Sequence, residues 1–251
     1  MKVVLTFDIE PDLPNVLNTY SGIKIGLLKI LRLLKYYDLK ATFFCTGTIA
    51  QDFPSYLKLI ESNGHEIACH GWNHERLSQM NFEKCRELIF KSKKILEKTC
   101  PNSKIIGFRA PYLSPPTFLF EILYDLGFIY DSSITSHNKQ KTSHKNFYKV
   151  TEFSPCKLSG YFRFPLTYNR IKKATLKTDL IIFYFHSWEF LNMKRLILKK
   201  SNINIALKNI LFRPDRWWNT GISFTNKLSL FINDFISNQI EFITLKKLCY
   251  N

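Results

Sequence analysis

The stretch Gly64-His-Glu-Ile-Ala-Cys-His-Gly-Trp-Asn-His74 begins with a short apolar run and ends in two histidines four residues apart. The apolar run predicts a strand, and imidazoles at positions i and i+4 of a tight loop or helical turn can reach the same metal ion. His70 and His74 are therefore candidate ligands of a divalent metal, whose third protein ligand has to come from elsewhere in the chain. In the alternative interpretation, one histidine ends the strand and the other is solvated.

A third ligand is available in the N-terminal stretch Lys2-Val-Val-Leu-Thr-Phe-Asp-Ile-Glu10, which reads as a buried strand with two acids at its end. Because side chains alternate along a strand, Asp8 and Glu10 point to the same face, where two carboxylates repel each other unless a cation lies between them. A metal held by one carboxylate and the two histidines would remove this repulsion and leave the other carboxylate free as a base. The alternative is a strand that simply ends in a polar loop at Pro11-Asp12.

The rest of the chain alternates helix and strand. Apolar residues at a helical period predict helices over Gly22–Tyr37, Thr48–Ser62 with an interruption near Pro54, Asn81–Lys98, Thr117–Leu126 and Ser223–Ile236. Short apolar runs predict strands at Lys40–Thr46, Lys104–Arg109, Phe128–Tyr130, Leu180–His186 and Glu241–Leu245. Between Asp131 and Lys177 we expect irregular loops with short strands near Lys149–Phe153 and Gly160–Phe164.

This alternation is typical of an α/β barrel or of a doubly wound sheet. The barrel is favoured because the polar candidates fall at the carboxyl ends of predicted strands, where a barrel assembles its active site: Asp8, Glu10, His70, Arg109 and His186. The length of 251 residues allows one large or two small domains, and we expect a single domain over residues 1–251.

The sequence shows no targeting signal. No run is long enough to span a membrane, and Asp8 and Glu10 interrupt the N-terminal apolar stretch too early for a signal peptide, so we expect a cytoplasmic protein. The six cysteines include no Cys-x-x-Cys pair, which argues against a zinc ribbon or a dithiol redox site.

The charge is strongly and unevenly basic. Lys and Arg number 36 against 20 acids, a net charge of +16; Ser132–Thr151 contains no acid, and Met193–Arg216 is basic and runs into Trp217 and Trp218. Such surfaces favour anionic partners, so we expect docking either on an anionic membrane face, as peripheral association at the inner membrane for a cytoplasmic protein, or on a pyrophosphate-linked sugar. The alternative is a compositional bias without a partner. No motif indicates nucleic-acid binding, and none is expected.

Five short motifs follow one another along the chain: Thr6-Phe-Asp-Ile-Glu10, His70-Gly-Trp-Asn-His74, Arg109-Ala-Pro-Tyr112, Tyr130-Asp-Ser-Ser133 and Phe183-Tyr-Phe-His186. In this order they resemble the polysaccharide deacetylase family, the NodB-homology domain of carbohydrate esterase family four. The resemblance covers roughly Lys2–Trp188, and Phe242–Leu248 is also similar to the end of that domain. It implies a distorted (β/α) barrel of about seven strands and metal-dependent removal of an N-acyl group, usually acetyl, from an amino sugar. That sugar can belong to a polysaccharide, a glycolipid or a nucleotide-linked sugar.

The resemblance also implies site roles: Asp8 as base, His186 as general acid, His70 and His74 as metal ligands, and the backbone N–H near Tyr112 facing the oxyanion. We place Pro111 and Trp188 in the same substrate region. Arg109 would orient Asp8, whereas Asp131 is either a partner of one of these groups or a structural turn acid. The expected cofactor is one divalent ion, Zn²⁺ first, with Co²⁺, Mn²⁺ or Fe²⁺ as alternatives.

The sequence also departs from the common family pattern. Ile9 separates the two acids that most members have side by side, Phe183 replaces the usual leucine, and the fourth motif lacks its tryptophan. Since Glu10 has the longer side chain and lies nearer the loop, we expect it to bind the metal while Asp8 is the base. Two other functions stay open, a binding protein that keeps the fold without turnover and an amidohydrolase on a non-sugar amide or ureide.

Overall fold

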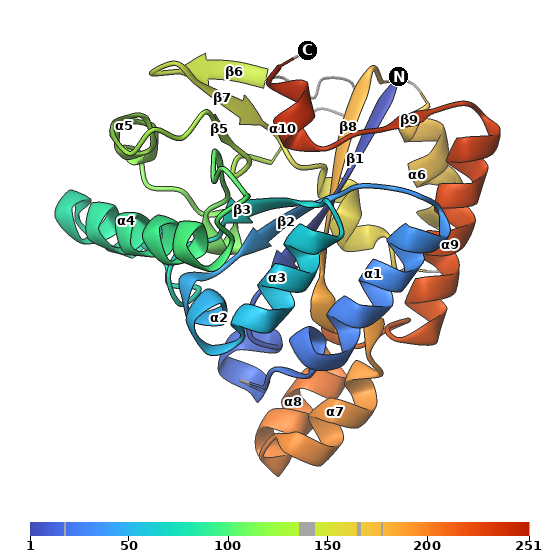
Figure 1. Cartoon of the computed structure of the whole chain (residues 1–251). Coiled ribbons are helices and arrows are strands. Elements are labelled where there is room, and N and C mark those ends of the chain that lie inside the picture. The colour runs from blue at the N-terminus through green and yellow to red at the C-terminus, as the bar shows by residue number, and fades with distance from the viewer. Residues whose placement is uncertain (18, 136–143, 165–166, 177, 251) are drawn as a thin grey trace.

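A curled sheet forms the centre of the protein (Figure 1). The structure, a computed structural model, describes residues 1–17, 19–135, 144–164, 167–176 and 178–250. Its strand order is β6-β7-β5-β4-β3-β2-β1-β8, and β9 pairs with the start of β1. The strands are β1 (Lys2–Ile9), β2 (Thr42–Cys45), β3 (Glu66–Cys69), β4 (Gly107–Phe108), β5 (Tyr130–Asp131), β6 (His144–Phe147), β7 (Val150–Phe153), β8 (Leu180–His186) and β9 (Glu241–Phe242).

Seven of these strands, from β7 through β1 to β8, run parallel and curl into a half-barrel. A backbone hydrogen bond from the N–H of Cys156, just after β7, to the carbonyl of Ile182 in β8 (2.8 Å) brings the two ends of the curl together. The predicted distorted barrel of about seven strands is therefore confirmed.

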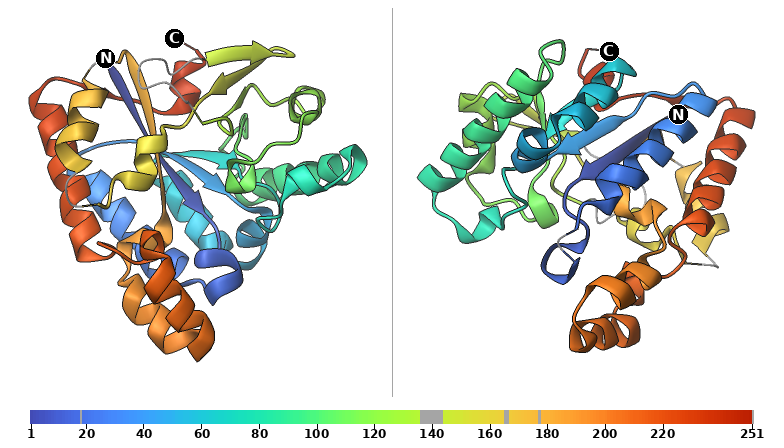
Figure 2. Two further views of the ribbon diagram at one scale, coloured as in Figure 1. Left: turned by 180° about the vertical axis from the view of Figure 1, so that it is seen from behind. Right: turned by 60° about the horizontal axis from the view of Figure 1, so that its bottom comes forward.

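Most helices cover the outside of the curl (Figures 1 and 2). The helices of the described residues are α1 (Leu27–Tyr36), α2 (Gly47–Asp52), α3 (Pro54–Ser62), α4 (Phe82–Thr99), α5 (Leu119–Asp125), α6 (Tyr168–Thr175), α7 (Met193–Lys200), α8 (Ile203–Phe212), α9 (Ile222–Ser237) and α10 (Leu245–Leu248). Of these, α7 and α8 project beyond the curl, and α10 packs Leu245 on its concave side. Pro54 separates α2 from α3, as the sequence predicts, because proline is tolerated at the first position of a helix but not in its interior.

The alternation along β1 sorts its side chains between two cores. Leu5, Phe7 and Ile9 lie in the main core with the helices, whereas Val4 lies in a smaller cluster with Tyr130 and other residues of the curl's concave side. Thr6, Asp8 and Glu10 continue the Val4 side of the strand, so the polar residues of β1 face the inside of the curl.

Three local predictions were wrong. Part of the irregular region expected between Asp131 and Lys177 is a strand, β6, which pairs antiparallel with β7, while residues 136–143 lie outside the described residues. The strand expected at Gly160–Phe164 is instead the 3₁₀ helix η5 (Lys157–Tyr161), which leads Phe162 into the core against Phe185. The last strand stops at Phe242, because the Thr244 hydroxyl accepts a hydrogen bond from the N–H of Lys247 and caps α10.

Close packing holds the segment that follows β8. A Cβ atom on Gly26, next to α1, would lie 2.0 Å from the carbonyl oxygen of Ser187, so only glycine allows this approach to η7 (Ser187–Phe190). Lys29 also donates to the Phe190 carbonyl (3.0 Å). Within the described ranges, no helix combines the length and the apolar character needed to cross a membrane. The single domain and the cytoplasmic location stay predictions.

Candidate active site

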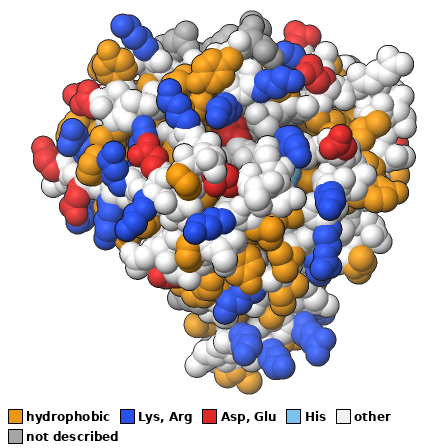
Figure 3. Space-filling model, viewed as in Figure 1, with side chains coloured by type: hydrophobic (Ala, Val, Ile, Leu, Met, Phe, Trp, Pro, Cys, Tyr) orange, Lys and Arg blue, Asp and Glu red, His pale blue; other side chains and the backbone are white. Residues whose placement is uncertain are grey.

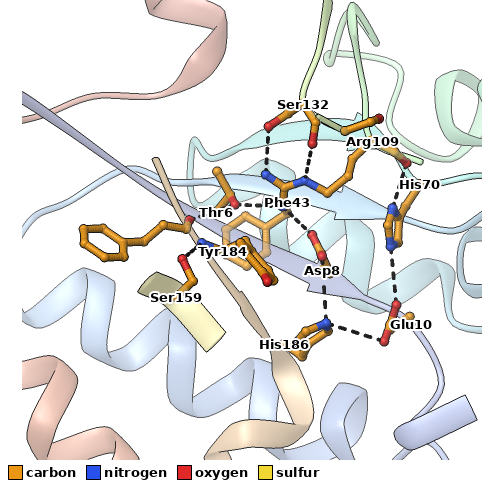
Figure 4. A network of polar contacts seen from close by, with 12 residues as sticks. Thr6, Asp8, Glu10, Phe43, His70, Arg109, Ser132, Ser159, Tyr184 and His186 are labelled. Carbon is orange, nitrogen blue, oxygen red and sulfur yellow. Dashed lines mark hydrogen bonds and ion pairs between the residues drawn. The ribbon is translucent and has the colours of Figure 1, made fainter. Parts of the chain in front are cut away.

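The candidate residues meet at the carboxyl edge of the parallel strands. Asp8 in β1 pairs with His186 in β8, while Cys69 in β3 pairs with Phe108 in β4. The residues that follow these last two strands, His70 and Arg109, therefore start at the same level. Figure 4 shows their side chains converging with Asp8, Glu10 and His186, as expected from the strand-end positions.

A tight turn after β3 aims both histidines at one point. Gly71 has a left-handed backbone (φ 73°), its carbonyl accepts a hydrogen bond from Ser92 Oγ (2.6 Å), and the Glu75 carboxylate accepts from two backbone N–H groups of the turn. As a result, the ring centroids of His70 and His74 lie 5.3 Å apart. Glycine is required here because other residues adopt this conformation only with strain.

Glu10 completes a buried triad with the two histidines. Its Oε2 atom lies 3.3 Å from His70 Nε2 and 2.5 Å from His74 Nε2, and one ligand atom from each residue lies within 4.8 Å of the others. His70 Nδ1 lies 2.8 Å from the Arg109 carbonyl, an arrangement in which Nδ1–H donates and Nε2 faces Glu10 with its lone pair.

The triad fits a metal ion. Glu10 Oε2 is buried and accepts no hydrogen bond of good geometry from the described residues, as expected of an oxygen placed for a cation. Burial alone would raise the pKa of Glu10, but the nearby imidazoles, His74 above all, hold it well below its ordinary value. Two imidazole nitrogens and one carboxylate oxygen are the protein ligands of many catalytic zinc sites.

Arg109 forms a buried ion pair with Asp8. The arginine is fully buried, and its Nη1 donates to Asp8 Oδ1 (2.7 Å) and to the Thr6 hydroxyl (2.8 Å). Its Nε and Nη2 donate to the carbonyl and hydroxyl of Ser132 (3.0 Å each), and its guanidinium lies 4.0 Å from the centre of the Phe44 ring. With so many donors engaged, Arg109 fixes the orientation of Asp8.

His186 faces both acids from the neighbouring strand β8. Its Nε2 lies 4.0 Å from Asp8 Oδ2 and 3.9 Å from Glu10 Oε1, and its Nδ1 is hydrogen-bonded to Glu189 Oε1 (3.0 Å). Glu189 in turn pairs through Oε2 with Arg163 Nε (2.9 Å). Burial opposes protonation of His186, but the bond to Glu189 and the charges of Glu10, Glu189 and Asp8 outweigh it and raise the pKa to about 9.

Asp131 lies outside this convergence. Its carboxylate accepts from the hydroxyl and the N–H of Ser133 (2.7 and 3.2 Å), and the Ser133 hydroxyl accepts from the N–H of Ala110 (2.8 Å). Asp131 therefore supports the loop that carries Arg109. Burial raises its pKa, and the neighbouring Glu152, also buried, has a pKa of about 10 because of burial and the Asp131 charge.

A cavity of about 330 Å³ opens over the triad, within the range of small-molecule sites, roughly 300–1,000 Å³. Tyr112 lines it with a left-handed backbone (φ 60°), and its ring packs on His74, with 4.3 Å between centroids. Pro111 is not part of the lining but is buried against Gly71. Trp188 lines the cavity, stacks on His186 (4.9 Å) and has a buried Nε1 without a hydrogen-bond partner among the described residues.

The sequence interpretation missed the supporting residues. Glu189 follows His186 by three positions, a spacing that could have indicated the contact, whereas Arg163 comes from a loop and gave no local signal. Ser132 lies in the motif Tyr130–Ser133, but no role was expected for it. His65 lies away from the triad, as expected: its Nδ1 accepts from the N–H of Ala41 (3.4 Å), and burial lowers its pKa to about 4.

The chain is similar to known polysaccharide deacetylases. The family model described as "Polysaccharide deacetylase" matches residues 1–130. Over 115 residues the chain is 34% identical to the peptidoglycan-N-acetylglucosamine deacetylase of Bacillus cereus and 31% identical to the peptidoglycan deacetylase of Helicobacter pylori. Each match covers 46% of this chain, and the chain spans only 36% and 39% of the two relatives.

A solved structure extends the similarity to nearly the whole chain. The structure of the Bc1960 peptidoglycan N-acetylglucosamine deacetylase is similar with a TM-score of 0.60 and 20% identity, covering 98% of this chain and 86% of that one. At this identity the similarity concerns the fold alone.

Proposed function

Because the chain belongs to the polysaccharide deacetylase family, we propose that it is a metal-dependent hydrolase that removes an N-acetyl group from an amino sugar. The observation that carries the proposal is the buried triad of Glu10, His70 and His74 beneath the cavity, with a second carboxylate beside it. The names of the relatives support an N-acetylated amino sugar as the substrate class.

We assign the metal to Glu10 Oε2 and the Nε2 atoms of His70 and His74, with Zn²⁺ as the best match to this donor set and Co²⁺, Mn²⁺ or Fe²⁺ as alternatives. When bound, such an ion supplies Lewis-acid activation of the amide carbonyl and of water. The Arg109 carbonyl keeps His70 in the tautomer that this role requires.

The other residues divide the proton transfers. Asp8, held by Arg109, takes the proton from the attacking water, and its free Oδ2 lies toward the cavity side occupied by His186. His186, held through Nδ1 by Glu189, gives a proton from Nε2 to the leaving amine. The Tyr112 N–H donates to the developing oxyanion, and Trp188 Nε1 donates to a polar group of the sugar.

The test combines metal analysis with acetate release from N-acetylated chitooligosaccharides and peptidoglycan fragments. His70→Ala and His74→Ala should each lose both bound metal and activity, because two remaining protein donors bind a metal weakly. His65→Gln is the matched control, a buried histidine close in sequence that should keep both. Full metal occupancy in the two alanine variants, or bound metal in the wild type with no acetate released from any amino sugar, would refute the proposal.

A further inference from the structure

Helices α7 and α8 form a hairpin that projects from the carboxyl edge of the sheet. Figures 1 and 2 show it extending beyond the rest of the protein, at the end where β1 and β8 finish. Its inner side is anchored by Met193, Ile197 and Ala206, which pack in a cluster with Leu13, Leu17, Trp188 and Leu191. The hairpin is therefore fixed to the body, and its outer side is left to solvent.

That outer side is apolar. Ile203, Leu207 and Leu211, on successive turns of α8, are 72%, 52% and 67% exposed, and Phe212 is 74% exposed. Leu198 on α7 is 56% exposed, and Trp218, just beyond the hairpin, is 42% exposed. Exposed apolar side chains that gather on one element mark an interaction surface, because scattered ones are the norm elsewhere.

The same hairpin is basic. Between Asn192 and Pro214 there are six cations and no acid: Lys194, Arg195, Lys199, Lys200, Lys208 and Arg213. Figure 3 shows Lys and Arg side chains interspersed with hydrophobic ones over this projection. Apolar and cationic side chains together suit the boundary between anionic lipid headgroups and acyl chains. A second copy of the chain suits the surface poorly, since two such hairpins would repel each other.

The C-terminal end of the hairpin lies at the cavity. Arg213 and Arg216, at and after this end, line the cavity with Asp215 and Glu189, and Asp215 pairs with Arg213 (2.7 Å). Arg163, which pairs with Glu189, also donates to the carbonyls of Asp215 and Trp218. Arg216 Nη1 binds Asn209 Oδ1 (2.5 Å) and makes no ion pair with a described residue, so its charge is available to an anionic group at the cavity mouth.

We propose that the α7–α8 hairpin docks on an anionic lipid surface and that the deacetylase, if the function proposed above holds, acts on an amino sugar carried by a phosphate-containing lipid in that surface. The docked face and the cavity mouth adjoin, so a sugar held close to the headgroups reaches the triad without leaving the surface. Arg216 is placed to contact the phosphate of the carrier.

Vesicle co-sedimentation tests the docking step. Wild-type protein should bind vesicles of phosphatidylcholine with about a third phosphatidylglycerol, bind pure phosphatidylcholine vesicles weakly, and dissociate at high salt. The variant Leu207→Gln/Leu211→Gln and the variant Lys199→Gln/Lys200→Gln should each lower the partition coefficient about tenfold or more. The controls are Leu230→Gln, at a position with the same 52% exposure as Leu207, and Lys35→Gln/Lys58→Gln, which should bind as the wild type does.

Two results would overturn the docking proposal. One is binding that depends neither on anionic lipid nor on the hairpin residues. The other is self-association without vesicle binding. In that case the molecular mass of the wild type in solution would rise with protein concentration, the rise would be absent in Leu207→Gln/Leu211→Gln, and the occupant of the surface would be a second copy.

Activity measurements separate this inference from the proposed function. On soluble chitooligosaccharides, the two hairpin variants should match the wild type, because their substituted residues lie outside the cavity. On an N-acetylglucosaminyl lipid phosphate in anionic vesicles, the wild type should be at least tenfold faster than the hairpin variants. Equal rates on the vesicle substrate would refute the lipid-carried substrate. A wild type inactive on every amino sugar would refute the proposed function and leave the docking result standing.

Discussion

Removing the charge of Asp8 and removing that of Glu10 should impair metal binding and activity in different ways. Asp8 is bonded to Arg109 at 2.7 Å, whereas Glu10 Oε2 faces both histidine nitrogens. Asp8→Asn should therefore keep the metal and lose the base, with kcat lower by about 10²-fold or more. Glu10→Gln should weaken metal binding and recover part of its activity in excess zinc.

The effect on stability can be worked out from the same contacts. At a free zinc concentration 100 times Kd, binding adds about 2.7 kcal/mol, or roughly 5–11 °C in Tm for a chain of this size. If Glu10→Gln weakens binding a hundredfold, the gain falls to about 0.4 kcal/mol, less than about 2 °C. Asp8→Asn should keep the full zinc-dependent shift, although breaking the buried pair with Arg109 lowers the starting Tm by roughly 6–12 °C for a loss of about 3 kcal/mol.

Thermal unfolding with chelator and with added zinc measures these shifts, and metal analysis and acetate release complete the comparison. Glu75→Gln, at a carboxylate that accepts backbone hydrogen bonds near the triad, controls for general damage to the turn and should keep the zinc-dependent shift. A zinc-dependent shift that disappears in Asp8→Asn but persists in Glu10→Gln, together with activity in the latter, would show that the roles are reversed.

Three further changes probe the rest of the site. Glu189→Gln should lower kcat about tenfold with KM within twofold, because it loosens His186 without touching substrate; a change confined to KM in initial-rate measurements would contradict this. Trp188→Phe keeps the stack on His186 but lacks the indole N–H, so KM should rise about 2- to 10-fold, and an unchanged KM would remove this donor from the substrate site. Burial and the Asp131 charge raise the pKa of Glu152 well above its ordinary value, so the folded state retains a proton that the unfolded chain releases, and stability should fall as the pH rises above that ordinary value. Glu152→Gln should flatten that slope in urea unfolding, and an unaltered slope would assign it to another group.

The site residues that come from the N-terminal part of the chain could be predicted, because they stand at the ends of strands. Asp8, His70 and Arg109 stand at the ends of short apolar runs, and in a parallel sheet the ends of neighbouring strands meet at one edge. The expectation that Glu10 is the metal-binding acid also came from local geometry, since Glu10 lies one pleat beyond Asp8. That Glu10, and not Asp8, lies against the histidines agrees with the expected arrangement, while the roles themselves stay predictions.

The site residues that come from the later part of the chain could not be predicted as well, because loops without a periodic sequence pattern position them. Arg163 reaches Glu189 from the end of a 3₁₀ segment that reads as a strand because Tyr161, Phe162 and Phe164 are aromatic. The α7–α8 hairpin read only as a basic segment, because its apolar residues lie on two sides, one packed and one exposed, and blur the helical pattern. In each case tertiary contacts override the local pattern.

The seam between β1 and β8 joins two groups of site residues that come from distant parts of the chain. On one side, residues up to Tyr112 contain the triad, Asp8 and Arg109, all inside the region that matches the family model. On the other side, His186, Glu189 and Arg163 come from the later part of the chain, beyond that region. Mutations in the hairpin, which lies in this later part but contains none of these three residues, can change the surface beside the cavity while the triad, Asp8, Arg109 and His186 stay unaltered. A lineage can thus acquire a new substrate without rebuilding its chemistry.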